Sequence, residues 1–166
     1  MYLLDSNIYI NFYDRYYRMA FFPSFWDKLP SILKDSVVIP DIVVAENYQD
    51  AIFKKWLDDN YDKSLVRHQD YVQEWAEVIQ YISDCGFYKP SALTSDKGWA
   101  KQNIADPWLI AIAKKEGYTI VTAENKNPNL NPNNPSKSAK IPDVCDQLQV
   151  PCITMNDFFK IIHLNI

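Results

Sequence analysis

The sequence predicts an α/β fold, with a parallel β-sheet that has helices on both faces. Short apolar runs of strand length alternate along the chain with longer segments of helical periodicity. Neighbouring Pro and Asp mark three helix starts, at 40–41, 106–107 and 142–143. Strands that alternate with helices form βαβ units, and the strands of such units are parallel.

Four segments are predicted strands. Residues 2–5 form an apolar run that ends in an aspartate, 37–39 read Val-Val-Ile, and 118–122 read Tyr-Thr-Ile-Val-Thr. The fourth segment, 151–154, begins with a proline, which is tolerated at the first position of a strand but not in its middle.

The intervening segments are predicted helices, and the whole chain, 1–166, is expected to form one domain. The insert 59–104 is a candidate helical cap over the sheet. Residues 125–138 are rich in Asn, Pro and Ser, so we expect a mobile loop there. The predicted helices cover 7–19, 24–34, 41–58, 69–84, 106–116, 142–148 and 155–162.

Composition excludes several kinds of site. The chain has three glycines, too few and too scattered for a loop that cradles phosphates. Its two histidines and three cysteines lack the spacing of a structural zinc site, and no G-x-S-x-G motif appears. The side chains left for chemistry are mostly carboxylates.

The same composition bears on compartment and partners. An odd number of cysteines and the lack of an apolar leader segment predict a reduced, cytoplasmic setting. No apolar run approaches the ~18 residues that a membrane span requires. The formal net charge of −4 gives no overall attraction to nucleic acid, although two bound divalent cations would offset it.

Three acidic residues fall at junctions between predicted strands and helices. Asp5 ends the first strand, Asp106 precedes a helix, and Glu124 follows a strand by two residues. In an open parallel sheet the ligand crevice lies beyond the carboxyl ends of the strands, so these carboxylates would share it. Each also has a structural interpretation, as a helix cap for Asp5 and Asp106 and as a solvated loop charge for Glu124.

Glu46 is the fourth acid of interest, because it shares the apolar face of the predicted helix 41–58. A buried glutamate is costly unless its charge is paired or binds a metal ion. The alternative is an edge position from which the side chain reaches water. The predicted face consists of Ile42, Ala45, Glu46, Gln49, Ile52, Phe53 and Trp56.

Four carboxylates at one sheet edge predict a divalent metal site. Like charges in a shared site repel, so a cation is expected among them. Oxygen ligands without nearby His or Cys suit Mg²⁺ or Mn²⁺. Such ions activate water and orient phosphodiesters, and metal-assisted phosphodiester hydrolysis is therefore the expected reaction.

The order of these segments resembles that of the PIN-domain nucleases. The stretches that carry the resemblance start at Tyr2-Leu-Leu-Asp-Ser-Asn7 and span the chain to about residue 158, and the closing ones resemble the DUF4411 branch of uncharacterised bacterial proteins. The other stretches are Val38-Ile-Pro-Asp-Ile-Val-Val-Ala-Glu46, Ala105-Asp-Pro-Trp-Leu-Ile-Ala-Ile-Ala113, Gly117-Tyr-Thr-Ile-Val-Thr-Ala-Glu124, Lys140-Ile-Pro-Asp-Val-Cys145 and Val150-Pro-Cys-Ile-Thr154.

The resemblance implies a three-layer α/β/α fold and divalent-metal cleavage of single-stranded RNA, often as the toxin of a bacterial toxin–antitoxin pair. It implies Asp5, Glu46, Asp106 and Glu124 as metal ligands and catalytic residues. The family more often has Asp at the fourth position, so Asp143 is an alternative to Glu124. An antitoxin protein and a second copy of the chain are candidate partners.

Substrate contacts are expected from cations and from polar groups near the sheet edge, namely Asn7, Thr122 and Lys126. Further candidate phosphate contacts are Arg15, Arg18, Lys137 and Lys140, and candidates for base stacking are Tyr9, Phe12 and Tyr13, whose alternative role is packing.

Two other functions compete with the nuclease. A catalytically inactive PIN-like interaction module would use the acids only as caps. An aspartyl phosphatase usually needs a second Asp two residues after the first, and this chain has Asn7 there.

Overall fold

The structure, a computed structural model, describes residues 1–47 and 50–166. Its sheet has three parallel strands in the order β1 (Tyr2–Leu4), β2 (Thr119–Thr122) and β3 (Cys152–Thr154). The central strand β2 pairs Ile120 with Leu3 on one side and Val121 with Ile153 on the other.

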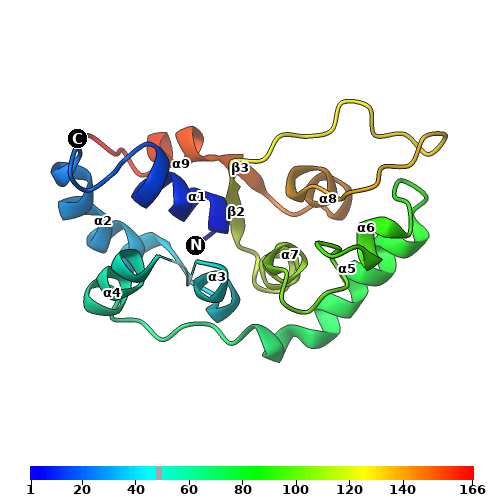
Figure 1. Ribbon diagram of the computed structural model, residues 1–166, viewed down its shortest axis with the longest axis horizontal. Helices are drawn as coiled ribbons and strands as arrows, with labels where there is room; N and C mark the ends of the chain where they lie inside the picture. Colours follow the sequence, from blue (N-terminus) through cyan, green and yellow to red (C-terminus); the bar gives the residue numbers. More distant parts are fainter. Residues whose placement is uncertain (48–49) are drawn as a thin grey trace.

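Helices cover both faces of this sheet, which confirms the predicted α/β class. α1 and α9 lie on one side, α7 and α8 lie on the other, and α5 packs on the outside of α7 (Figure 1). The helices of the described residues are α1 (Ser6–Ile10), the π-helical turn η1 (Asn11–Arg15), α2 (Pro23–Ser36), α3 (Asp41–Glu46), α4 (Ala51–Asn60), the 3-10 turn η2 (His68–Tyr71), α5 (Val72–Asp84), α6 (Ser91–Thr94), α7 (Ala105–Glu116), α8 (Ile141–Leu148) and α9 (Met155–Ile161).

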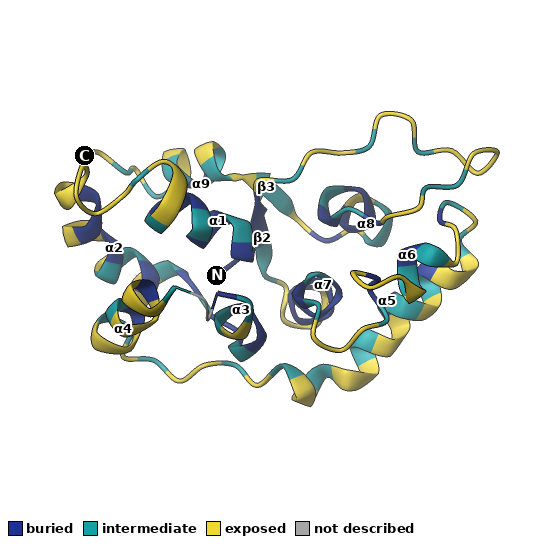
Figure 2. Ribbon diagram, in the orientation of Figure 1, coloured by how far each residue is buried: buried dark blue, intermediate teal, exposed yellow. Residues whose placement is uncertain are grey.

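α7 is the central buried helix. Residues 107–113 are all buried, as the dark ribbon of Figure 2 shows, because neighbouring elements pack on several sides of the helix. Trp108 stacks on Trp75, with 5.0 Å between ring centroids, and its indole N–H donates to the Gln102 carbonyl at 3.0 Å. Gly117 ends the helix at φ +73°, a conformation that favours glycine, and β2 begins two residues later. The first turn of α7 is therefore firmly placed beside the sheet.

The predicted strand at 37–39 is wrong, although its residues pass beside β1. Only Val37 forms a bridge, to Tyr2, and the Val38 N–H donates to the Tyr2 carbonyl at 2.9 Å. The chain then pairs with Val66 instead, and Pro40 has no N–H to extend a ladder.

The predicted helix 41–58 is interrupted, so its apolar face is only partly correct. α3 ends at Glu46, and Asp50 caps α4 by accepting from the Phe53 N–H at 2.7 Å. Phe53 is buried as expected, whereas Ile52 is 76% exposed. The predicted face position Gln49 lies outside the described residues.

Aromatic residues of the first helical segment pack rather than face solvent. Tyr9 and Phe12 are fully buried in the core, so their candidate role in base stacking is wrong. Tyr13 is half-buried and stacks on Phe53 with 4.8 Å between ring centroids. The predicted helix 7–19 is shorter in the structure, where α1 continues into the π-helical turn η1 and helical structure ends at Arg15.

The two remaining segments have distinct structures. Residues 59–104 include α5 and α6, and α5 packs against α7. Residues 125–138 form neither helix nor strand, and Ser136 joins them by backbone hydrogen bonds to Phe87 and Lys89 (2.9 and 2.8 Å). The predicted mobility of this loop stays a prediction. Among the described residues, no helix is long and apolar enough to cross a membrane.

Candidate functional site

Four acidic side chains come together where β1 and β2 end. Asp5 directly follows β1, and Glu124 lies two residues beyond β2. Asp106 is in the first turn of α7, and Glu46 is the last residue of α3. The charges of the other three all raise the pKa of Asp106, which identifies the four as one electrostatic cluster, here called the acid cluster.

Asp5 is the most deeply buried member of the acid cluster, at 3% exposure. Burial raises its pKa to about 7, and the charges of Glu124 and Glu46 act in the same direction. A hydrogen bond from the Thr122 hydroxyl, at 2.8 Å, opposes the shift. Asp5 precedes α1, but its side chain makes no capping hydrogen bond, so the cap interpretation does not account for this carboxylate.

Asp106 experiences the same repulsion. Burial and the charges of Asp5, Glu124 and Glu46 raise its pKa well above the ordinary range, and Lys140 lowers it only in part. The residue before α7 is Ile104, so Asp106 lies inside the first turn and is not the helix cap. At neutral pH the acid cluster therefore retains a proton or requires added positive charge.

Glu46 connects the segments that carry the two aspartates. One carboxylate oxygen accepts from the Ala105 N–H at 2.8 Å, and the other accepts from the Ser6 hydroxyl. Ser6 follows Asp5 and Ala105 precedes Asp106 in the chain. Glu46 therefore holds the backbone segments that carry the two aspartates. Both carboxylate oxygens thus bind groups of the protein, although the side chain is only half-buried.

Thr122 and Asn7 hold the end of β2 in place. Thr122 is buried, and besides donating to Asp5 its hydroxyl accepts from the Glu124 N–H at 3.1 Å. The Asn7 side chain accepts from the Ala123 N–H at 3.1 Å and lies 3.5 Å from the Thr122 hydroxyl. Their geometry fits a positioning role better than direct contact with a substrate.

The structure brings Glu124, and not Asp143, to the other acids. Glu124 accepts from the Ile141 N–H at 2.9 Å and from the Lys140 ammonium at 3.2 Å, and its charge raises the pKa of Asp5. Both oxygens of Asp143 instead accept from the Asn127 N–H, at 3.0 and 3.3 Å. Asp143 thereby anchors the start of the Asn/Pro-rich loop.

A cavity of about 290 Å³ opens beside Asp106 and Glu124 and is rich in lysines. Lys97, Lys137 and Lys140 line it, and only Lys97 was missed by sequence reasoning. This residue comes from the insert 59–104, and no local pattern indicates that it would approach the sheet edge. The cavity therefore places positive charge next to the acid cluster.

The other predicted cations lie elsewhere. Lys126 lines a second cavity of about 260 Å³ with Glu124, and its ammonium pairs with Asp146 at 2.7 Å. Arg15 and Arg18 are exposed and line neither cavity, and Arg18 pairs with Asp14 at 3.5 Å.

The donor set of the acid cluster suits a hard cation, but its side chains are not gathered around one point. Within residues 1–47 and 50–166, no three Asp, Glu, His or Cys side chains are arranged to hold a metal ion. Glu46 and Glu124 are instead held apart by hydrogen bonds to the first residues of α7 and α8.

Comparisons with known proteins identify the family. Searches of curated proteins and of solved structures found no match to the chain. The model of the family described as "Domain of unknown function (DUF4411)" matches residues 2–166. The chain thus belongs to the DUF4411 family.

Proposed function

We propose that this protein is an endoribonuclease of the PIN superfamily that uses Mg²⁺ or Mn²⁺ to hydrolyse phosphodiester bonds of single-stranded RNA. The observation that carries the proposal is the raised pKa of both Asp5 and Asp106 within one carboxylate cluster. A divalent cation would offset both the repulsion among these carboxylates and the cost of burying their charges. The four members of the acid cluster are all carboxylates, and oxygen ligands favour magnesium or manganese over zinc.

The residues have separate roles in this proposal. Asp5 and Asp106 hold the ion, with Glu46 and Glu124 completing the set of carboxylates. When bound, the ion activates water and stabilises the charge that develops on the leaving oxygen. Thr122 orients the Asp5 carboxylate through their 2.8 Å hydrogen bond.

RNA is the proposed substrate because positive charge adjoins the acid cluster. Lys97, Lys137 and Lys140 line one cavity with Asp106 and Glu124, so they can bind the phosphates that flank the cleaved bond. The net charge of −4 belongs to the whole chain, whereas this local charge is what an approaching strand meets.

The PIN resemblance extends the proposal to a biological role. The order of acidic motifs is similar to that of PIN-domain toxins, and we propose that this chain is the toxin of a bacterial toxin–antitoxin pair. Its partners would then be an antitoxin protein and a second copy of the chain, in a cytoplasmic setting.

A cleavage assay tests the activity. We expect the purified protein to cut an end-labelled single-stranded RNA pool when Mn²⁺ or Mg²⁺ is present and to stop when the ion is chelated. The same RNA annealed to its complement is the matched control and should be cut more slowly. A protein that leaves the whole pool intact with both ions is not this nuclease.

The fourth carboxylate gives a separate prediction. Glu124→Gln should slow cleavage about ten- to hundredfold, the cost usually seen when one supporting group of a metal site is lost. Asp143→Asn should keep most of the activity, because Asp143 binds the Asn127 N–H instead. Initial cleavage rates of the two variants decide the matter, and the reverse order would make Asp143 the ligand.

A catalytically inactive PIN-like interaction module is the alternative function. One observation favours it, since Asp5, Glu46 and Glu124 each already accept a hydrogen bond within the protein. This module predicts no affinity for Mn²⁺. A calorimetric titration that shows binding, and loss of binding in Asp5→Asn, excludes it.

A further inference from the structure

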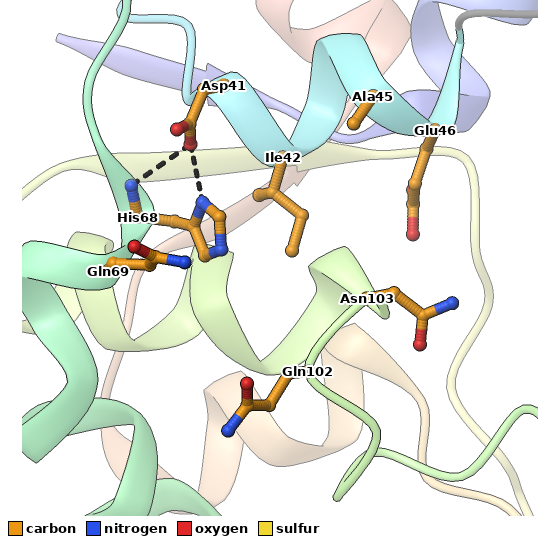
Figure 3. Close-up of a pocket in the computed structure, with 8 residues that line it drawn as sticks. All are labelled: Asp41, Ile42, Ala45, Glu46, His68, Gln69, Gln102 and Asn103. Carbon is orange, nitrogen blue, oxygen red and sulfur yellow. Dashed lines mark hydrogen bonds and ion pairs between the residues drawn. The ribbon is translucent and has the colours of Figure 1, made fainter.

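A third cavity is lined in part by Glu46 and has a different chemistry from the lysine-rich one. It has a volume of about 680 Å³, within the range of small-molecule sites. Figure 3 shows it between α3, the His68–Gln69 segment and the loop at Gln102 and Asn103. Its lining residues include three side-chain amides and no Lys or Arg, so it differs from the lysine-rich cavity.

The walls of this cavity are fixed by contacts with the core. Asp41 accepts from the His68 backbone N–H at 3.0 Å and lies 2.6 Å from the ring nitrogen Nδ1. The His68 ring packs edge-on against Trp108, with 4.8 Å between centroids. Trp108 also donates to the Gln102 carbonyl, and this bond holds the loop at Gln102 and Asn103 in place. A cavity whose walls are held in this way binds a ligand at a lower entropic cost.

Three polar amides line the cavity, those of Gln69, Gln102 and Asn103. The Gln69 amide oxygen already accepts from the Arg67 guanidinium at 3.3 Å, whereas the hydrogen bonds found among the described residues leave the side chains of Gln102 and Asn103 to a ligand. Each amide offers both donors and an acceptor. Ile42 points into the same space and provides an apolar surface (Figure 3). Amide groups beside an apolar wall match a nucleobase, whose edge is polar and whose faces are not.

Glu46 connects this cavity to the acid cluster. It lines the cavity, and its carboxylate binds Ser6 and Ala105, the chain neighbours of Asp5 and Asp106. The lysine-rich cavity opens beside Asp106 and Glu124. A strand that crosses the acid cluster can therefore place phosphates toward the lysines and a base toward the amides.

We infer that the cavity bounded by Ile42, His68, Gln69, Gln102 and Asn103 binds one unstacked nucleobase of the RNA beside the bond that is cut. This inference rests on the proposed nuclease function and adds its specificity-determining site. The amides bind the base edge and select among bases, while the base faces contact Ile42. A base-paired nucleotide cannot enter, because its edge is already hydrogen-bonded, and this explains a preference for single strands.

Binding measurements test this site apart from catalysis. The parent protein carries Asp106→Asn so that RNA stays intact, and its affinity for labelled oligonucleotides of A, C, G or U is measured by fluorescence polarisation. Gln102→Ala and Asn103→Ala should each weaken binding of the preferred oligonucleotide about tenfold and reduce the spread among the four. Gln73→Ala, an exposed amide on α5, is the matched control and should leave affinity unchanged.

Salt dependence provides a second measurement. Gln102→Ala should keep the parent's dependence of affinity on salt, because it removes no phosphate contact, whereas Lys137→Ala should reduce that dependence. Gln102 and Asn103 are both exposed, so their alanine variants should fold, and thermal unfolding checks that they do.

The outcomes separate this inference from the proposed function. If the wild-type chain cuts RNA but folded Gln102→Ala and Asn103→Ala variants keep the parent's base preference, the base site is overturned and the nuclease stands. If the parent prefers one base through these amides and the wild-type chain cuts no RNA, the base site is supported and the nuclease is overturned. Equal affinity of the parent for all four oligonucleotides also overturns the base site.

Discussion

Asp106→Asn is expected to slow RNA cleavage by about a thousandfold while the protein stays folded. Asparagine keeps the size of the side chain but removes the charge that would bind the ion. Losing one strong electrostatic contact to a reacting centre typically costs 10²- to 10³-fold in rate, and an ion ligand should lie at the upper end of that range. Because Asp106 repels Asp5, Glu46 and Glu124, the variant should unfold at the same or a higher temperature.

Single-turnover cleavage of one labelled oligonucleotide measures the effect, with Mn²⁺ in excess. Asp84→Asn, an exposed carboxylate on α5, is the matched control and should cleave at the wild-type rate. Asp5→Asn should show the same loss as Asp106→Asn. Retention of wild-type cleavage by both variants would mean that the acid cluster is not the active centre.

Sheet strands were predictable where apolar runs were long enough and free of competing partners. The three strands of the sheet lie within the predicted ranges 2–5, 118–122 and 151–154. The run at 37–39 has similar residues, but its backbone hydrogen bonds are divided between Tyr2 and Val66. That division depends on where residue 66 lies in space, which no local pattern records.

The interruption of the helix after Glu46 had a readable signal. Asn47 and Asp50 are residue types favoured at helix ends, because their side chains bond to the backbone. In the structure the Asn47 amide donates to the Val43 carbonyl at 2.9 Å, and Asp50 caps α4. The periodicity of the apolar residues across this region hid the two end signals.

Site positions were more predictable than site contacts. The rule that parallel strands end at one sheet edge was enough to bring Asp5 and Glu124 together. It could not show that Glu46 binds the backbone N–H of Ala105, since 59 positions separate the two in sequence. The same holds for Lys97, whose approach to the site depends on how the insert 59–104 folds back.

Without divalent cations, the protein should lose stability as the pH rises from about 4 to about 7. The folded state holds the Asp5 proton with a pKa of about 7, against an ordinary value of 3.8 in the unfolded chain. Between these values the folded state binds more protons, so the free energy of unfolding falls as pH rises. The shift corresponds to about 4 kcal/mol at most, because each pKa unit is worth about 1.4 kcal/mol.

Asp5→Asn isolates this effect, because its amide oxygen can still accept from the Thr122 hydroxyl. The variant should be more stable than wild type near pH 8 and close to it near pH 4, as measured by urea unfolding with chelator present. A wild-type stability that rises over this range, or a variant less stable near pH 8, contradicts the assignment.

Adding Mn²⁺ near pH 8 then distinguishes a metal site from carboxylates that only support the fold. A cation that binds the folded state at about a hundred times its dissociation constant adds about 2.7 kcal/mol of stability. Wild type should gain this stability and Asp5→Asn should not, because the variant has lost the ligand along with the repulsion. An interaction module with the same buried acids would show the pH dependence without the response to Mn²⁺. The two measurements together therefore test the role of the acid cluster even before its RNA is known.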